Sequence, residues 1–217
     1  MSLLNLYLAA HRALVGVDTA MGLHPDHEAR AWAQTQDCSA LPAHVSKLYP
    51  IAHSGALIAG RGTIPFLLDV VGFASMIETF DQLEDRMPAI LRQVTEIDAA
   101  RVAAVPLPEN VKHPKREILL VGWSAREGSM VATHYECQAG LGQAFDAQPV
   151  DLLQAPWDAE QGPAIEPRTD HDMLQLALAQ VSHVRAKHPG APIGGRLIVA
   201  ELTRGSIAIR EVGELSL

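Results

Sequence analysis

Pairs of β-prone segments joined by short polar turns recur along this sequence, and they are the feature that most constrains its fold. Four pairs predict β-hairpins: 3–11 with 14–20, 47–53 with 55–59, 117–123 with 130–137, and 197–203 with 206–212. Apolar residues at helical spacing predict three helices, at about 64–75, 87–103 and 170–187. One more strand is expected within 145–153. The predicted order is hairpin, hairpin, two helices, hairpin, helix, hairpin.

Hairpins and helices that fall in separate blocks favour antiparallel sheets covered by helices over a parallel, doubly wound sheet. The Gly-x-Gly at Gly60 and Gly62 does not indicate a dinucleotide site, because it lacks the third glycine and the strand–helix–strand context. A length of 217 residues suits a single domain over 1–217. We expect a loop insertion within it at about 21–46, where the sequence turns polar.

The composition argues against several classes of partner. Hydrophobic residues make up 48% of the chain and charged residues 19%, which is typical of a globular domain. A net charge of −8 argues against nucleic acid, because phosphate binding needs clustered Lys and Arg. No apolar run approaches the ~20 residues that cross a bilayer, and no signal peptide is apparent. Cys38 and Cys137 lack metal-ligand spacing and are expected to be free thiols of a cytoplasmic protein.

Other polar clusters are better explained without chemistry. The stretch 24–28 contains His-x-x-His, but four polar residues around a proline are typical of a solvated turn rather than a metal site. Asp172 and His171 fit the first turn of a helix capped by Thr169. The acidic stretch 78–85 is expected to be a solvated turn between helices. The sequence therefore predicts no cofactor and no metal.

Three residues occupy telling places in the predicted order. Ser2 precedes the first hairpin, and Lys47 opens the second hairpin. Asp18 lies 16 positions after Ser2, near the end of the first hairpin. With the element order, this pattern resembles the proteasome-like branch of the N-terminal nucleophile hydrolases. The resemblance implies an α+β fold, a four-layer αββα sandwich of two antiparallel sheets flanked by helices.

The resemblance also implies a role for each of these residues. Ser2 would be the nucleophile once Met1 is removed, with its own α-amine as base, since an amine of pKa ~7.7–8.0 suits proton transfer near neutrality. Lys47 would favour the neutral amine and stabilise negative charge, and Asp18 would orient Lys47. Gly60 would donate its N–H to an oxyanion, and Gly62 is nearly as suitable.

Two functions from different classes stay open. The resemblance implies a turn Asp-x-x-Ser-Gly-Gly after the last helix, but here Gly190 and Ile193 replace its two polar residues. That difference favours a catalytically silent scaffold or assembly subunit. The alternative is a hydrolase that cleaves a peptide or a smaller amide. Both predict a homo-oligomer, and the apolar segment Ile64–Ile77 is expected to be partly interfacial.

Overall fold

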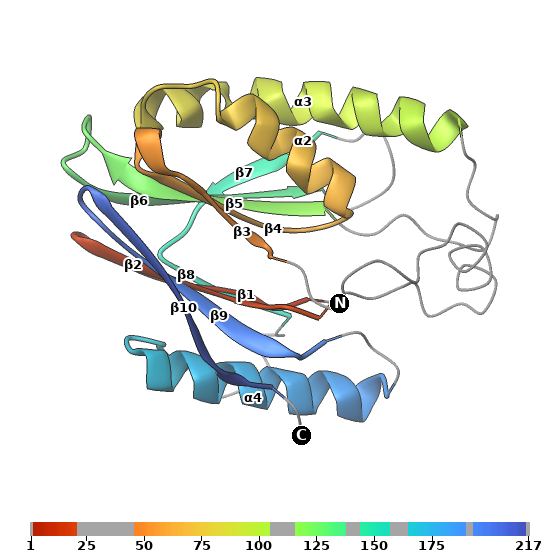
Figure 1. The fold of residues 1–217 in the computed structure, drawn as a ribbon, viewed down its shortest axis with the longest axis vertical. Coiled ribbons are helices and arrows are strands. Elements are labelled where there is room, and N and C mark those ends of the chain that lie inside the picture. Colours follow the sequence, from red (N-terminus) through yellow and green to blue (C-terminus); the bar gives the residue numbers. More distant parts are fainter. Residues whose placement is uncertain are drawn as a thin grey trace.

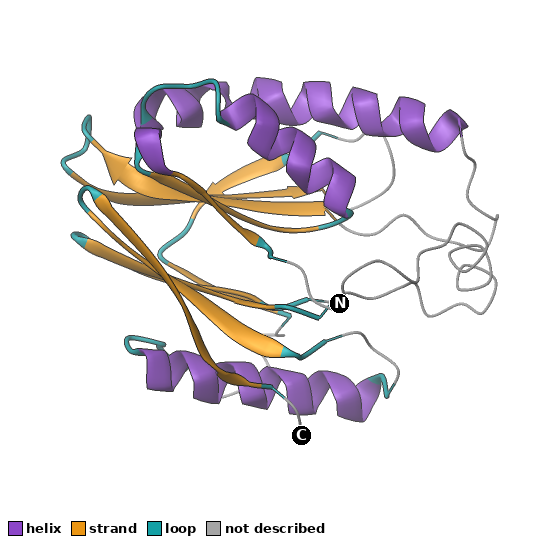
Figure 2. Cartoon of the chain, viewed as in Figure 1, coloured by secondary structure: helices purple, strands orange, loops and turns teal. Residues whose placement is uncertain are grey.

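A computed structural model describes residues 2–20, 46–104, 116–137, 144–156, 165–189 and 193–215. Within these ranges the chain forms two five-stranded sheets stacked face to face, with helices on both outer faces (Figures 1 and 2). All of the described strand pairs are antiparallel. The predicted four-layer sandwich is therefore confirmed. None of the described helices is long and apolar enough to cross a membrane.

The first sheet contains both the amino-terminal and the carboxy-terminal hairpin. Its strand order is β10-β9-β2-β1-β8. The bounds are β1 Leu4–Ala9, β2 Arg12–Asp18, β8 Leu152–Ala155, β9 Arg196–Thr203 and β10 Ser206–Glu214. Helix α4, Asp170–Lys187, covers the outer face of this sheet (Figure 1). Its start is the predicted one, with Thr169 and Asp172 forming a reciprocal capping box.

The second sheet contains the two middle hairpins. Its strand order is β3-β4-β5-β6-β7. The bounds are β3 Leu48–Ile51, β4 Ala56–Arg61, β5 Arg116–Ser124, β6 Ser129–Cys137 and β7 Asp146–Pro149, with a short 3₁₀ helix η2 at Ala52–Ser54. Helices α2, Ile64–Ala74, and α3, Phe80–Ala104, cover its outer face (Figure 2).

Three apolar clusters fill the three spaces between the four layers. Residues that alternate along each strand divide between the two faces of its sheet. On β5, Leu119 and Val121 pack between the sheets, whereas Ile118 and Leu120 pack under α2 and α3. Leu14 and Met173 belong to the third cluster, between the first sheet and α4. This alternation of side chains is the pattern from which the hairpins could be predicted.

A buried pair of amides links the first sheet to α4. Asn5 Nδ2 donates to Gln180 Oε1 at 2.8 Å, and Gln180 Nε2 donates back to Asn5 Oδ1 at 2.9 Å. Both side chains are fully buried. Because each amide satisfies the other, neither leaves a buried polar group unpaired.

Two boundaries differ from the sequence-based expectations. The segment predicted as one strand within 145–153 forms two strands in different sheets, β7 and β8, so the chain crosses between the sheets near Val150. Helix α3 begins at Phe80 rather than near Met87, with Pro88 inside it. The acidic stretch expected to be a turn therefore lies partly in this helix, where Asp81 accepts hydrogen bonds from Ser124 Oγ and the Arg126 N–H. Most of the predicted insertion at 21–46, with its His-x-x-His turn, lies outside the described residues.

Gly122 on β5 lets the start of α3 approach the sheet. A Cβ atom at this position would lie 2.2 Å from Phe80 Cδ2 and 2.7 Å from Cε2. We expect Gly122→Ala to destabilise the protein by about 1–3 kcal/mol through overpacking, measured by urea unfolding. Gly72→Ala is the matched control, since a Cβ there meets nothing within 4 Å and alanine favours a helix. Equal effects of the two variants would contradict this account of Gly122.

Candidate functional site

The Lys47 ammonium lies where the starts of β1 and β3 meet the end of β2. Its Nζ donates to Ser2 Oγ at 3.0 Å, to Asp18 Oδ1 at 2.7 Å and to the Ala20 carbonyl oxygen at 2.8 Å. Three acceptors match the three donors of an ammonium group. The structure thus brings together the three side chains that the sequence placed in one site, and it adds a backbone carbonyl.

Asp18 is fully buried at the end of β2 and accepts bonds from three segments of the chain. Its Oδ1 accepts from the Leu3 N–H at 2.8 Å as well as from Lys47, and its Oδ2 accepts from the Gly194 N–H at 3.2 Å. Hydrogen bonds to an ionised acceptor are stronger than neutral ones. This carboxylate therefore fixes the chain immediately after Ser2, the strand that begins after Lys47 and the turn before β9.

Ser2 is half-buried at the entrance to β1, and its hydroxyl oxygen accepts the bond from Lys47. Leu3, the next residue, is fully buried among the side chains between the first sheet and α4. The Ser2 side chain is therefore anchored on one side by the core and on the other by a cation. A hydroxyl in this position can serve as a nucleophile, because the residue is partly exposed and its oxygen lies beside a positive charge.

Burial lowers the pKa of Lys47 from its ordinary value of 10.5, since an apolar environment disfavours the charged form. The Asp18 carboxylate opposes this shift through its charge and its hydrogen bond, and the Arg61 guanidinium adds to it by repulsion. The Lys47 ammonium is thus held by its partners against a desolvation penalty.

The two glycines expected as oxyanion donors, Gly60 and Gly62, differ in what surrounds them in the structure. The Gly60 N–H donates to the Lys47 carbonyl oxygen at 3.3 Å, one residue beyond the last pair of the β3–β4 register, Leu48 with Ala59. A Cβ at Gly60 would lie 2.4 Å from Leu67 Cδ2, so the glycine also allows α2 to pack closely. Gly62 is exposed and comes just before the cap of α2, where the Thr63 side chain accepts from the Phe66 N–H. Of the two, Gly62 fits an oxyanion donor better, because the Gly60 N–H already has an acceptor.

The turn before β9 supports the site through its backbone. Gly194 bonds to Asp18, whereas the Ile193 side chain is buried in the cluster under α4. The apolar residue at 193 is thus a core residue at the place where the resemblance implied a serine. Gly190, the other residue that departs from the turn implied by the resemblance, lies outside the described residues.

Sequence reasoning missed the backbone members of the site and Arg61. The Leu3 N–H, the Gly194 N–H and the Ala20 carbonyl have no signal in residue type, because every residue offers these groups. Arg61 sits beside the glycines that were considered, but its influence on Lys47 depends on strand pairing that only the fold reveals.

Comparison with known proteins was informative only at the level of structure. No protein-family model and no curated protein sequence matches the chain. The fold is similar to that of Anbu (ancestral beta-subunit) from Yersinia bercovieri, with a TM-score of 0.61 and 12% sequence identity over 99% of this chain and 88% of that one. This likeness agrees with the αββα architecture described above. At this identity, the likeness shows the architecture and no activity.

The pairing of Lys47 with Asp18 predicts strong energetic coupling. Lys47→Met leaves the Asp18 carboxylate buried without its cation, so we expect a loss of about 3–5 kcal/mol in unfolding free energy. Asp18→Asn combined with Lys47→Met should cost less than the sum of the two single changes, measured by urea unfolding. Arg196→Met, which breaks the exposed pair with Glu211, should cost no more than about 1 kcal/mol. Additive single and double effects at Asp18 and Lys47 would contradict the coupling.

Proposed function

We propose that this protein is an amide hydrolase whose nucleophile is the Ser2 hydroxyl, active once removal of Met1 frees the Ser2 amine. The observation that supports this most directly is the 3.0 Å contact between Lys47 Nζ and Ser2 Oγ, with the same ammonium held at 2.7 Å by a buried carboxylate. That contact lets one buried cation act on the hydroxyl oxygen while the carboxylate holds the cation in place.

The reaction would begin with transfer of the hydroxyl proton to the free α-amine of Ser2. Lys47 favours the neutral amine and stabilises the developing negative charge on Oγ. The oxygen attacks the substrate's carbonyl carbon, and the resulting oxyanion would accept a hydrogen bond from the Gly62 N–H. The C–N bond then breaks, and the leaving amine takes the proton held by the α-amine. Water hydrolyses the acyl-serine ester, which returns the hydroxyl and releases the acid.

The proposed substrate is a peptide or a smaller amide. An acyl group on Ser2 would lie at the end of the sandwich where β1, β3 and the turn before α2 meet. The chemistry requires an amide carbonyl and sets no further limit on the groups attached to it.

A catalytically silent scaffold is the second candidate, and Ile193 is the observation that favours it. This side chain is 2% exposed and packs in the core, so it supplies no polar support near Asp18. In that case Lys47 and Asp18 would stabilise the junction of the strands without turnover.

The mass of the intact protein separates these candidates first. The hydrolase requires a chain that has lost Met1, and quantitative retention of Met1 would leave only the scaffold. If the methionine is lost, the wild-type protein should be acylated by a β-lactone probe and Ser2→Ala should not, as measured by mass spectrometry. Ser182→Ala, which changes an exposed serine of α4, is the control and should label normally. Labelling that survives in Ser2→Ala would eliminate the mechanism.

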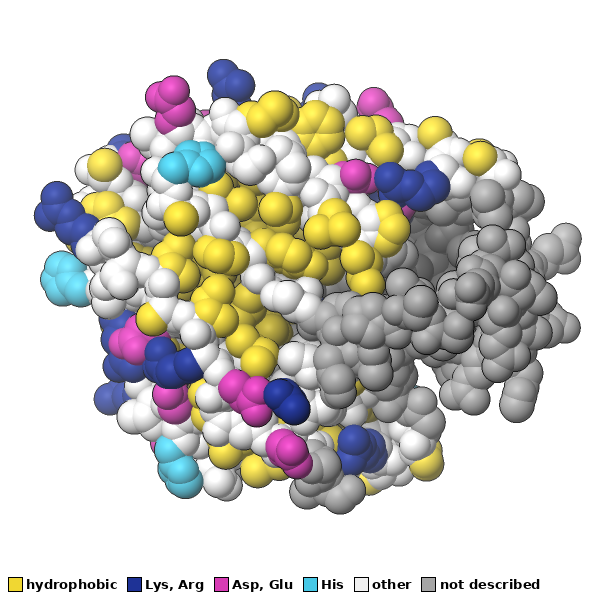
Figure 3. Space-filling view, in the orientation of Figure 1, with side chains coloured by type: hydrophobic (Ala, Val, Ile, Leu, Met, Phe, Trp, Pro, Cys, Tyr) yellow, Lys and Arg dark blue, Asp and Glu magenta, His cyan; other side chains and the backbone are white. Residues whose placement is uncertain are grey.

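Self-association through the outer face of α2 is part of the proposal. Leu68 and Met76 are 52% and 70% exposed on and just after this helix. Hydrophobic side chains gather in the upper half of the face shown in Figure 3, near α2 and α3. An oligomer would remove these side chains from water.

Charge on this helix should therefore dissociate the oligomer. We expect Leu68→Glu with Met76→Glu to lower the molar mass measured by light scattering to that of a monomer, with an unchanged circular dichroism spectrum. Leu152→Glu is the matched control, because Leu152 is 44% exposed but lies on β8. A wild-type monomer, or an oligomer that survives the double change, would contradict the role given to α2.

A further inference from the structure

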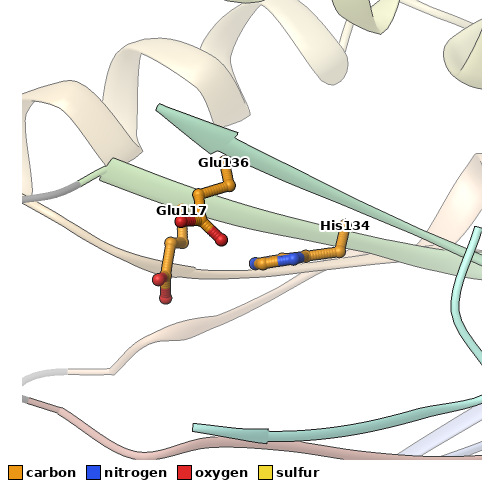
Figure 4. Close-up of side chains that lie close together, drawn as sticks. All are labelled: Glu117, His134 and Glu136. Atoms are coloured by element: carbon orange, nitrogen blue, oxygen red, sulfur yellow. The ribbon is translucent and has the colours of Figure 1, made fainter. Parts of the chain in front are cut away.

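A second cluster of polar side chains lies on the second sheet, apart from Ser2 and Asp18. Glu117 lies on β5 and His134 and Glu136 on β6. In the β5–β6 register Glu117 pairs directly with Glu136, and His134 pairs with Leu119, two positions further along. Side chains two residues apart on one strand share a face of the sheet, so all three project from the same face. Figure 4 shows them together, with the Glu136 carboxylate and the His134 ring turned toward one another.

That face is the one turned toward the other sheet. Leu119 lies two residues after Glu117 on β5, and Ala132 lies two residues before His134 on β6, so both share the face of these polar residues. Leu119 and Ala132 pack in the cluster between the sheets. Glu117 is 2% exposed, His134 is 7% exposed and Glu136 is half-buried. One ligand atom from each residue can be chosen so that all three lie within 4.8 Å of one another.

The charges in this cluster favour a cation. Two carboxylates stand directly opposite each other on adjacent strands, an arrangement that destabilises a sheet when both are ionised. The Arg61 guanidinium pairs with Glu117 Oε2 at 2.7 Å. A carboxylate has two oxygens, so Arg61 can hold Glu117 in position while the other oxygen faces a ligand.

We propose that Glu117, His134 and Glu136 form a binding site for a divalent transition-metal ion such as Mn²⁺ or Zn²⁺. One imidazole nitrogen with carboxylate oxygens suits these ions, whereas Mg²⁺ and Ca²⁺ prefer oxygen ligands alone. Metal–ligand distances of about 2.0–2.2 Å require the three donor atoms to close to roughly 3–3.5 Å. Side-chain rotation can supply that movement, because two adjacent strands of one sheet fix the backbones.

The site lies at the same end of the sandwich as Lys47. The Gly60 N–H bonds to the Lys47 carbonyl oxygen, Arg61 pairs with Glu117, and Glu117 pairs with Glu136. These residues therefore lie side by side at the same end of neighbouring strands. The metal site does not rest on the proposed hydrolysis, since none of its three ligands touches Ser2 in the contacts described above.

Titration of metal into chelator-treated, full-length protein tests the site. We expect one equivalent of Mn²⁺ to bind by calorimetry and by loss of the free-ion electron paramagnetic resonance signal, with Mg²⁺ at least tenfold weaker. Glu136→Gln and His134→Gln should each weaken Mn²⁺ binding at least tenfold. A His24→Gln/His27→Gln variant is the matched control and should bind as the wild type does, which separates the site from the His-x-x-His stretch.

Three outcomes would overturn the site: no stoichiometric Mn²⁺ binding by the wild type, unchanged binding in His134→Gln, or loss of binding in the His24/His27 variant. Should His134→Gln fail to fold by circular dichroism, the half-buried Glu136→Gln decides the question by the same measurements. Labelling of Ser2 by the β-lactone probe is a separate readout, so the failure of either proposal is distinguishable from failure of the other.

Discussion

The ionised carboxylate of Asp18 has no exposure to solvent, and the chain around it is arranged to satisfy it. A buried carboxylate costs several kcal/mol unless cations and donors surround it. Lys47 supplies the cation, and the Leu3 and Gly194 N–H groups supply the donors. These partners are the residue before β1, the residue before β3 and the turn before β9. The packing of the two sheets at this end therefore depends on one charge being fully paired.

Much of the fold was predictable because its signals are local. Alternating apolar residues reveal strands such as 117–123, and the Thr169–Asp172 pattern reveals the start of α4. The boundaries that failed depend on contacts distant in sequence. Helix α3 starts seven residues before Met87, where Asp81 bonds to Ser124. The segment around Val150 divides between two sheets because its halves find different neighbours, β6 and β1.

The candidate site shows the same division. Ser2, Asp18 and Lys47 could be named from residue type and order, since charged and nucleophilic side chains are visible in a sequence. The Ala20 carbonyl and the Gly194 N–H could not, and neither could the choice between Gly60 and Gly62, which depends on which N–H the β3–β4 pairing uses. Glu117 and His134 lie on the two strands of one predicted hairpin, but whether their side chains share a face depends on the register of β5 and β6.

The amide pair of Asn5 and Gln180 has a consequence for how accurately the chain is aligned. Apolar contacts between a helix and a sheet are non-directional, so they select one alignment less specifically than hydrogen bonds do. Here a slide of α4 by one turn would leave two fully buried amides without hydrogen-bond partners, and each would cost about 1–3 kcal/mol of stability. The pair therefore fixes the position of α4 along β1. Asn5 lies three residues after Ser2, so the pair also aligns α4 with the strand that begins next to the candidate nucleophile.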